Sequence, residues 1–103
     1  MDGKIYQFED YLLDVSEHRL QKDGKDIPLP PKVFEVLRVL IERHGQLVTY
    51  QDLMDEVWPE TFVEESNLRY SIHSLRKTLP ETLIETVPKR GYRFKPAVKS
   101  FTT

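Results

Sequence analysis

Cysteine is absent from the 103-residue sequence, which excludes disulfide bonds, thiolate metal sites and cysteine nucleophiles. The histidines His18, His44 and His73 lie far apart along the chain, without the spacing of zinc ligands. No apolar run approaches the roughly 20 residues of a membrane span, and the N-terminus lacks the apolar segment of a signal peptide. We therefore expect a soluble chain with no membrane segment, no metal and no other cofactor.

Patterns typical of enzymes are also missing. The acidic residues are scattered, the serines and histidines stand in no recognisable nucleophile context, and the sequence contains no glycine-rich phosphate loop. We therefore expect that the chain is not an enzyme.

Charge is distributed unevenly along the chain. The formal net charge is −2, but residues 1–68 hold 7 Lys/Arg against 15 Asp/Glu, whereas residues 69–103 hold 8 Lys/Arg against 2 Asp/Glu. A basic C-terminal third on an acidic body is typical of a protein that meets phosphates with one face. A solvated basic surface without a partner would give the same distribution.

The first thirty residues have the pattern of short strands, with β-prone residues interrupted by acidic pairs rather than by helical spacing. Asp23-Gly24 predicts a two-residue hairpin turn, in which both positions tolerate positive φ. This turn would place Lys22 opposite Lys25, Leu20 opposite Ile27 and His18 opposite Leu29.

Three helices are expected after this sheet. The first begins at Pro30-Pro31 and ends at Gly45, with apolar residues on more than one face, as in a central helix. Thr49 and Asp52 resemble a capping box for the second, which Pro59 ends. The third is predicted over about residues 64–79, with Leu68, Ile72, Leu75 and Leu79 facing inward.

The chain after Pro80 predicts a second hairpin over about residues 84–95, followed by a linker or terminal tail over residues 98–103. Sheet, helix, short strand, helix, turn, helix and hairpin are the parts of a winged helix-turn-helix. The expected fold is therefore α+β, with a small N-terminal antiparallel sheet, a three-helix core and a C-terminal β-hairpin wing. A single winged-helix DNA-binding domain would span residues 1–97.

The outer face of the third helix carries polar and cationic side chains suited to a major groove, where Asn pairs with adenine and Arg with guanine. From Arg69 to Leu79 it contains no acid, unlike an ordinary solvated helix face. The candidate DNA-binding residues on this helix are Asn67, Arg69, Tyr70, His73, Ser74, Arg76 and Lys77.

The second hairpin carries cations at its turn, Pro88-Lys89-Arg90-Gly91. Lys89 and Arg90 at the tip, with Arg93 on the returning strand, could reach a minor groove or a phosphate ridge. Basic hairpin tips also occur as solubility devices, so the tip alone leaves both interpretations open.

Several segments together resemble one family. Val87-Pro88-Lys89-Arg90-Gly91-Tyr92-Arg93-Phe94 and Leu75-Arg76-Lys77-Thr78-Leu79 resemble the effector domain of OmpR/PhoB-type winged-helix transcription regulators. Residues 30–37 resemble that family's first helix and residues 53–58 its second. Residues 60–68 are most similar to the N-terminal domain of CadC-like one-component regulators, in which another part of the protein senses the signal.

The resemblance implies a four-stranded N-terminal sheet, a three-helix core, a two-stranded wing and binding to tandem half-sites of double-stranded DNA. We also expect weak self-association on DNA and a cytoplasmic location, with which the absence of cysteine is compatible. It also implies contact with RNA polymerase through the 59–65 loop. Two departures from the family are evident. Many members have Arg-Gly-x-Gly where this chain has Pro88-Lys89-Arg90-Gly91, and His73 and Ser74 stand where arginines are common, so the DNA sequence read must differ.

Two functions are consistent with the sequence. The first is sequence-specific DNA binding for transcription regulation, with residues 64–79 in the major groove and residues 84–95 on an adjacent groove or the backbone. The second is a winged helix used for protein–protein interaction, which an apolar patch on the third helix would favour.

Overall fold

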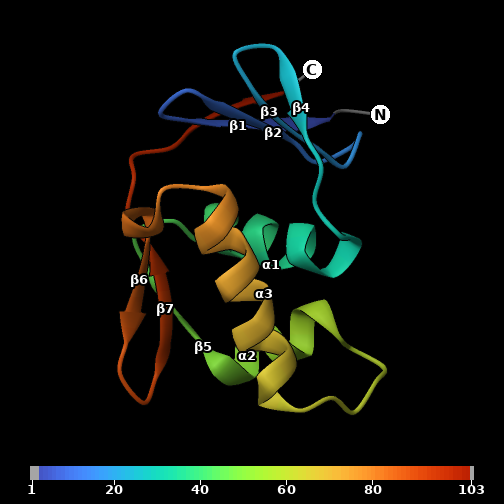
Figure 1. Cartoon of the computed structure of the whole chain (residues 1–103), viewed down its shortest axis with the longest axis vertical. Coiled ribbons are helices and arrows are strands. Elements are labelled where there is room, and N and C mark those ends of the chain that lie inside the picture. The colour runs from blue at the N-terminus through green and yellow to red at the C-terminus, as the bar shows by residue number, and fades with distance from the viewer. Residues whose placement is uncertain (1–2, 103) are drawn as a thin grey trace.

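The computed structural model describes residues 3–102. Its chain folds into an N-terminal sheet, a group of three helices and a second small sheet beside the helices (Figure 1). The expected α+β winged-helix architecture is confirmed, and each predicted helix is present.

The N-terminal sheet is built from β1 (Lys4–Phe8), β2 (Tyr11–Asp14), β3 (Arg19–Lys22) and β4 (Lys25–Ile27), all antiparallel. Asp23 and Gly24 both have positive φ, and Leu20 pairs with Ile27 as the turn predicts. His18 does not face Leu29: its φ is +53°, and its ring stacks on Phe34 at 4.1 Å between centroids. The positive φ removes His18 from the extended strand, so β3 begins at Arg19 and its pairing with β4 begins at Leu20.

A fifth strand completes this sheet. β8 (Lys99–Thr102) pairs with β1, giving the order β4-β3-β2-β1-β8. The linker or tail predicted over residues 98–103 is therefore wrong for residues 99–102. The side chains of β8 are all exposed, so the strand has no apolar alternation that sequence analysis could detect.

Helix α1 (Pro31–Glu42) lies in the middle of the molecule, between the N-terminal sheet and the other two helices (Figure 1). Its apolar residues are buried on more than one side, as expected, and Val36 and Val39 are fully buried. Pro31 occupies the first helical position, where its missing N–H costs nothing. The core thus runs through the whole molecule, because α1 has apolar neighbours both above and below.

Helix α2 (Tyr50–Val57) follows the short strand β5 (Leu47–Thr49). Thr49 Oγ1 accepts a hydrogen bond from the backbone N–H of Asp52 at 3.1 Å, which confirms the predicted N-cap. Lys32 Nζ donates to the carbonyl of Val57 at 2.8 Å, so a cation from α1 satisfies the negative end of the α2 dipole.

Helix α3 (Glu65–Thr78) is followed by a short 3-10 turn, η1 (Glu81–Leu83), and by the hairpin of β6 (Ile84–Val87) and β7 (Gly91–Phe94). Strand β5 pairs with β7, so the wing belongs to a three-stranded sheet of order β5-β7-β6. Tyr92 and Phe94 are buried, and the Phe94 ring meets Phe8 of the N-terminal sheet edge-on at 5.1 Å. This packing anchors the wing in the main core.

Candidate nucleic-acid interface

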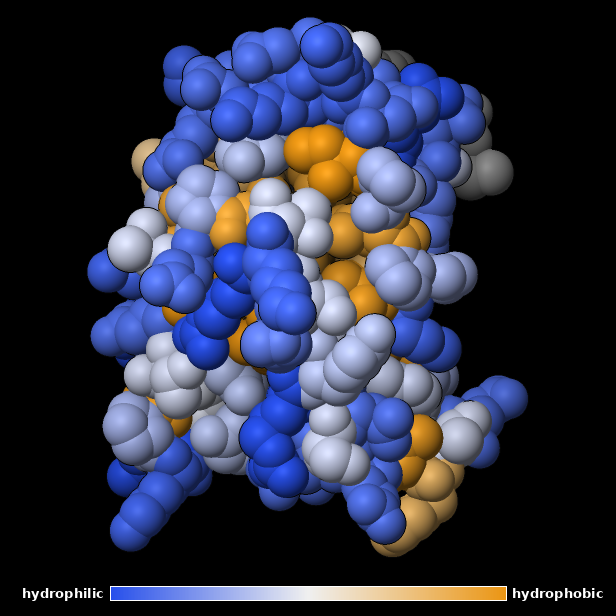
Figure 2. Space-filling model, viewed as in Figure 1, coloured by the Kyte–Doolittle hydropathy of each residue, from blue (hydrophilic) through white to orange (hydrophobic). Residues whose placement is uncertain are grey.

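The four predicted inner residues of α3, Leu68, Ile72, Leu75 and Leu79, are all buried. Their burial turns the opposite side of the helix to solvent. Figure 2 shows that the visible face of the molecule is mostly hydrophilic over α3 and the wing. Apolar surface in this view gathers at the junction with the N-terminal sheet and over the segment between α2 and α3.

Most of the predicted α3 residues are solvent-exposed, but not all to the same degree. Ser74 and Arg76 are half-buried, whereas the other five are exposed: Asn67, Arg69, Tyr70, His73 and Lys77. Ser66, which the sequence analysis did not include, is also exposed. Ser66, Tyr70, His73 and Lys77 follow one another at i, i+4, i+7 and i+11, so they form a single stripe along the centre of the outer face.

An acidic residue, Glu65, lies close to the exposed face of α3, although the sequence analysis did not consider it. Glu65 Oε2 lies 3.9 Å from Arg69 Nη1, and both side chains are exposed. Exposed pairs of this kind contribute about 0–1 kcal/mol, so Arg69 can exchange Glu65 for another acceptor at small cost. Glu65 stands four residues before Arg69, and this spacing is the sequence signal from which the ion pair could have been predicted.

Asn67 lies in the first turn of α3. Its Nδ2 donates to the carbonyl of Glu64 at 3.4 Å, a long contact, and its side chain remains exposed. Ser71, on the inner side of the helix, donates from Oγ to the carbonyl of Asn67 at 3.1 Å. The backbone at Asn67 is thereby fixed, while the amide group faces solvent.

The sequence predicts that Arg76 extends into solvent, but in the structure its side chain turns toward the wing. Its Nη2 donates to the carbonyl of Ile84 at 2.7 Å and to Thr86 Oγ1 at 2.8 Å. The guanidinium also lies 5.9 Å from the centre of the Tyr92 ring. Burial and the nearby Tyr50 raise the pKa of Tyr92, and the charge of Arg76 opposes this rise only in part. The phenol of Tyr92 therefore stays neutral at physiological pH.

The wing tip is a tight turn in which Arg90 N–H donates to the carbonyl of Val87 at 3.0 Å. Pro88 and Lys89 are its central residues, and Lys89 has φ +65°, the position that normally favours glycine. Lys89 and Arg90 are both exposed. Arg93 differs, because its Nη1 donates to Glu85 Oε1 at 2.9 Å across the β6–β7 pair, which neutralises its charge within the wing.

Glycine is required at position 91 because the backbone of β5 passes close to it, and not because of the turn conformation. A Cβ atom at this position would lie 2.0 Å from the carbonyl oxygen of Val48 and 2.8 Å from Thr49 Cα. Arg90 O also accepts from Tyr50 N–H at 3.1 Å, so the wing tip is bonded directly to the start of α2. The absence of a side chain at Gly91 therefore determines how closely the wing lies against β5 and α2.

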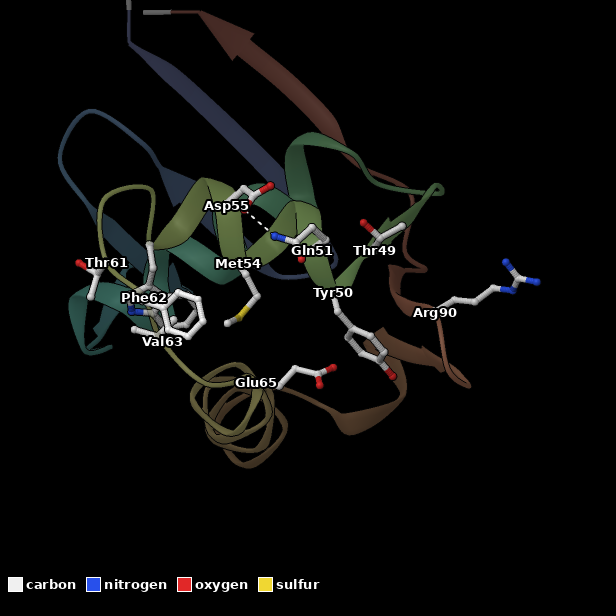
Figure 3. A pocket seen from close by; sticks show the side chains of 11 residues that line it. Thr49, Tyr50, Gln51, Met54, Asp55, Thr61, Phe62, Val63, Glu65 and Arg90 are labelled. Atoms are coloured by element: carbon white, nitrogen blue, oxygen red, sulfur yellow. Dashed lines mark hydrogen bonds between the residues drawn. The ribbon is translucent and has the colours of Figure 1, made fainter.

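A pocket of about 570 Å³ opens between α2, the start of α3 and the segment that joins them. Met54, Tyr50 and Glu65 point into this space, whereas Arg90 extends away from it (Figure 3). Phe62 lies at its rim with its side chain fully exposed, at 102%. Phe62 therefore adds exposed apolar surface beside a pocket that Met54 and Trp58 help to line.

Comparison with known proteins identifies the family. Residues 24–94 match the family model described as "Transcriptional regulatory protein, C terminal". The chain belongs to this family. The structure of the DNA-binding domain of CadC from Escherichia coli superposes with a TM-score of 0.85 at 25% identity, covering 98% of this chain and all of that one.

Two further relatives illustrate the breadth of the family. The transcriptional regulator HilA of Salmonella typhimurium is 34% identical over 95% of this chain, which spans 18% of HilA. The response regulator DrrB of Thermotoga maritima, an OmpR/PhoB homologue, is 31% identical with a TM-score of 0.80, covering 88% of this chain and 44% of DrrB. The expected resemblance to OmpR/PhoB-type effector domains, CadC among them, is confirmed. Sequence-specific DNA binding for transcription regulation is the function that membership in this family carries.

Two absences concern only the residues that the structure describes. Between residues 3 and 102, no three His, Asp or Glu side chains are grouped as metal ligands. Over the same residues, no helix has the length and apolar character needed to cross a bilayer.

Proposed function

We propose that this domain binds double-stranded DNA with α3 in the major groove and the β6–β7 tip on an adjacent groove or on the phosphate backbone. The observation that carries the proposal is the exposed stripe of Ser66, Tyr70, His73 and Lys77, flanked by Asn67 and Ser74 on one side and by Arg69 on the other. These side chains match the hydrogen-bonding edges of bases, and an α-helix fits the groove. The similarity of this chain to the DNA-binding domain of CadC supports the same use of the fold.

Lys89 and Arg90 are the cations of the wing in this proposal. Both are exposed at the tip, whereas Arg93 is bonded to Glu85. Each free cation can neutralise one phosphate and release counterions, which makes the affinity depend on salt. Arg93 contributes to DNA binding only if DNA displaces Glu85.

The domain binds tandem half-sites more tightly than a single half-site. One small module buries only about 600–1,000 Å² of protein surface on DNA, so two modules with a weak mutual contact gain affinity together. Selection of bound duplexes from random DNA, followed by gel shifts on one and two copies of the selected motif, tests both statements. Recovery of no enriched motif contradicts sequence-specific binding, and equal affinity for one and two copies contradicts the tandem arrangement.

The segment between α2 and α3, over residues 59–65, contacts RNA polymerase in this proposal. Phe62 is fully exposed there, beside the pocket that Met54 and Trp58 line. Phe62→Ala is expected to leave DNA affinity unchanged and to reduce polymerase binding to a promoter already occupied by the regulator. Glu60→Gln is the matched control on the same segment, because it removes a charge but no apolar surface.

A protein-interaction module without DNA binding has less support. Of the residues that the structure describes, Tyr70 is the one large apolar side chain exposed on α3, at 65%, so this helix offers no apolar patch. The proposal includes a cytoplasmic location, since the relatives are bacterial transcription regulators and the bacterial chromosome lies in that compartment.

A further inference from the structure

Arg76 joins α3 to the wing. Its Nη2 group carries two N–H bonds, and the carbonyl of Ile84 and Thr86 Oγ1 accept both, at 2.7 and 2.8 Å. Within residues 3–102, no other side-chain hydrogen bond connects α3 with β6 or β7. The planar guanidinium also lies over the Tyr92 ring, which limits its freedom to turn toward a ligand.

The two acceptors lie on β6, an edge strand of the wing sheet. Strand β7 pairs with β5 on one side, and the Phe94 carbonyl accepts from Gly45 N–H at 2.8 Å. Strand β6 is the outer strand of the β5-β7-β6 sheet, so its far edge has no neighbouring strand. Strand β6 does not pair with β5, so at this edge the hydrogen bonds from Arg76 connect the wing to α3.

A fixed distance between α3 and the wing tip matters because the two would touch neighbouring parts of one DNA molecule. A wing that is ordered before binding loses less conformational entropy on binding. We infer that Arg76 is a positioning residue, which fixes the wing relative to α3, and not the base or phosphate contact that the sequence predicts. This inference rests on the proposed DNA binding.

The test is a double-mutant cycle between Arg76 and the wing tip. Arg76→Gln is made in the wild-type wing and in the Lys89→Ala/Arg90→Ala variant, and Lys77→Gln is the control for loss of one helix cation. With the wild-type tip, Arg76→Gln is expected to weaken binding roughly tenfold, as coupled residues do. Without the tip cations it should weaken binding less than twofold, because the contacts that it positions are gone.

A direct phosphate contact predicts a different outcome. Arg76→Gln would then weaken binding equally in both backgrounds and make the slope of log affinity against log salt shallower by about 0.9 in each. That result would overturn the inference. Thr86→Val removes one acceptor and keeps the cation, so it is a milder form of the same change, expected to show a smaller loss with the same dependence on the tip.

A second measurement needs no DNA. Backbone ¹⁵N order parameters of residues 85–93 are expected to fall in Arg76→Gln relative to those of α3, and to stay unchanged in Lys77→Gln. Unchanged order in the Arg76 variant would refute the positioning role. If the wild-type domain binds no selected DNA, the proposed function fails, but this measurement still decides whether Arg76 holds the wing.

Discussion

Gly91→Ala is expected to be among the most destabilising single-methyl changes in this domain. The added Cβ would lie 2.0 Å from the carbonyl oxygen of Val48, and its three nearest neighbours are all backbone atoms of β5, so no flexible side chain can move aside. Strands β5 and β7 would have to separate, because the contact is far inside the van der Waals limit. The separation would strain the Thr49–Gly91 pairing and the hydrogen bond from Tyr50 N–H to the Arg90 carbonyl.

The magnitude follows from two contributions. Overpacking costs typically about 1–3 kcal/mol, and the one weakened backbone hydrogen bond, from Tyr50 N–H to the Arg90 carbonyl, adds about 1 kcal/mol. Their sum is about 2–4 kcal/mol, a large part of the roughly 5–15 kcal/mol by which such domains are stable. For a domain of this size, about 1 kcal/mol corresponds to about 4–8 °C in Tm, so a fall of about 8–30 °C is expected.

The assay is urea unfolding followed by the fluorescence of Trp58, the single tryptophan. Gly24→Ala is the matched control, because Gly24 has φ +79° but no atom within 4 Å of an added Cβ. That variant should lose only the cost of a left-handed alanine, about 1–2 kcal/mol. If Gly91→Ala unfolds at the same urea concentration as the control or a higher one, the close approach of β5 is not what requires glycine.

Three further predictions concern the surface. Lys89→Ala/Arg90→Ala should change the free energy of unfolding by no more than about 0.5 kcal/mol, while the salt slope of DNA binding becomes shallower by about 1.8; an unchanged slope would make the tip a solubilising surface only. Burial alone would raise the pKa of Glu35, but the hydrogen bond and charge of Arg38, with His18, outweigh it and lower the pKa. The stability that Glu35 contributes is therefore present above its ordinary pKa of 4.5 and is lost as pH falls through the lowered pKa of the folded state, so Glu35→Gln should destabilise the domain at pH 7 and flatten the acid limb of a pH–stability curve. Phe62→Ala should leave Tm and DNA affinity unchanged, and a loss of either would show that Phe62 packs in the core or contacts DNA.

Burial explains why so much of the fold could be predicted. The spacing of Leu68, Ile72 and Leu75 determines which side of α3 faces the core, and all three are buried. Asp23 and Gly24 are residues that tolerate positive φ, and both have positive φ in the turn. Periodicity and turn chemistry act over a few residues, so they can be read without knowledge of the tertiary structure.

Features that depend on distant residues could not be predicted. Gly91 was interpreted as part of the turn, but its neighbour Val48 lies more than forty positions earlier in the chain, and Lys89 takes the positive φ instead. The charge of Arg76 indicated a DNA contact, whereas its hydrogen-bond partners are on β6. Strand β8 is held by backbone pairing with β1 and has no buried face, so only the sheet partner identifies it.

The central claim is that exposed side chains of α3 read bases. The most direct measurement compares Asn67→Ala and Arg69→Ala with the wild type on a duplex selected from random DNA and on unselected DNA of the same length, at one salt concentration. The account predicts a loss of about 1–3 kcal/mol on the selected duplex and a much smaller loss on unselected DNA, because a base contact distinguishes sequences and a phosphate contact does not. Equal losses on both duplexes would contradict base reading by these residues and leave them as backbone contacts.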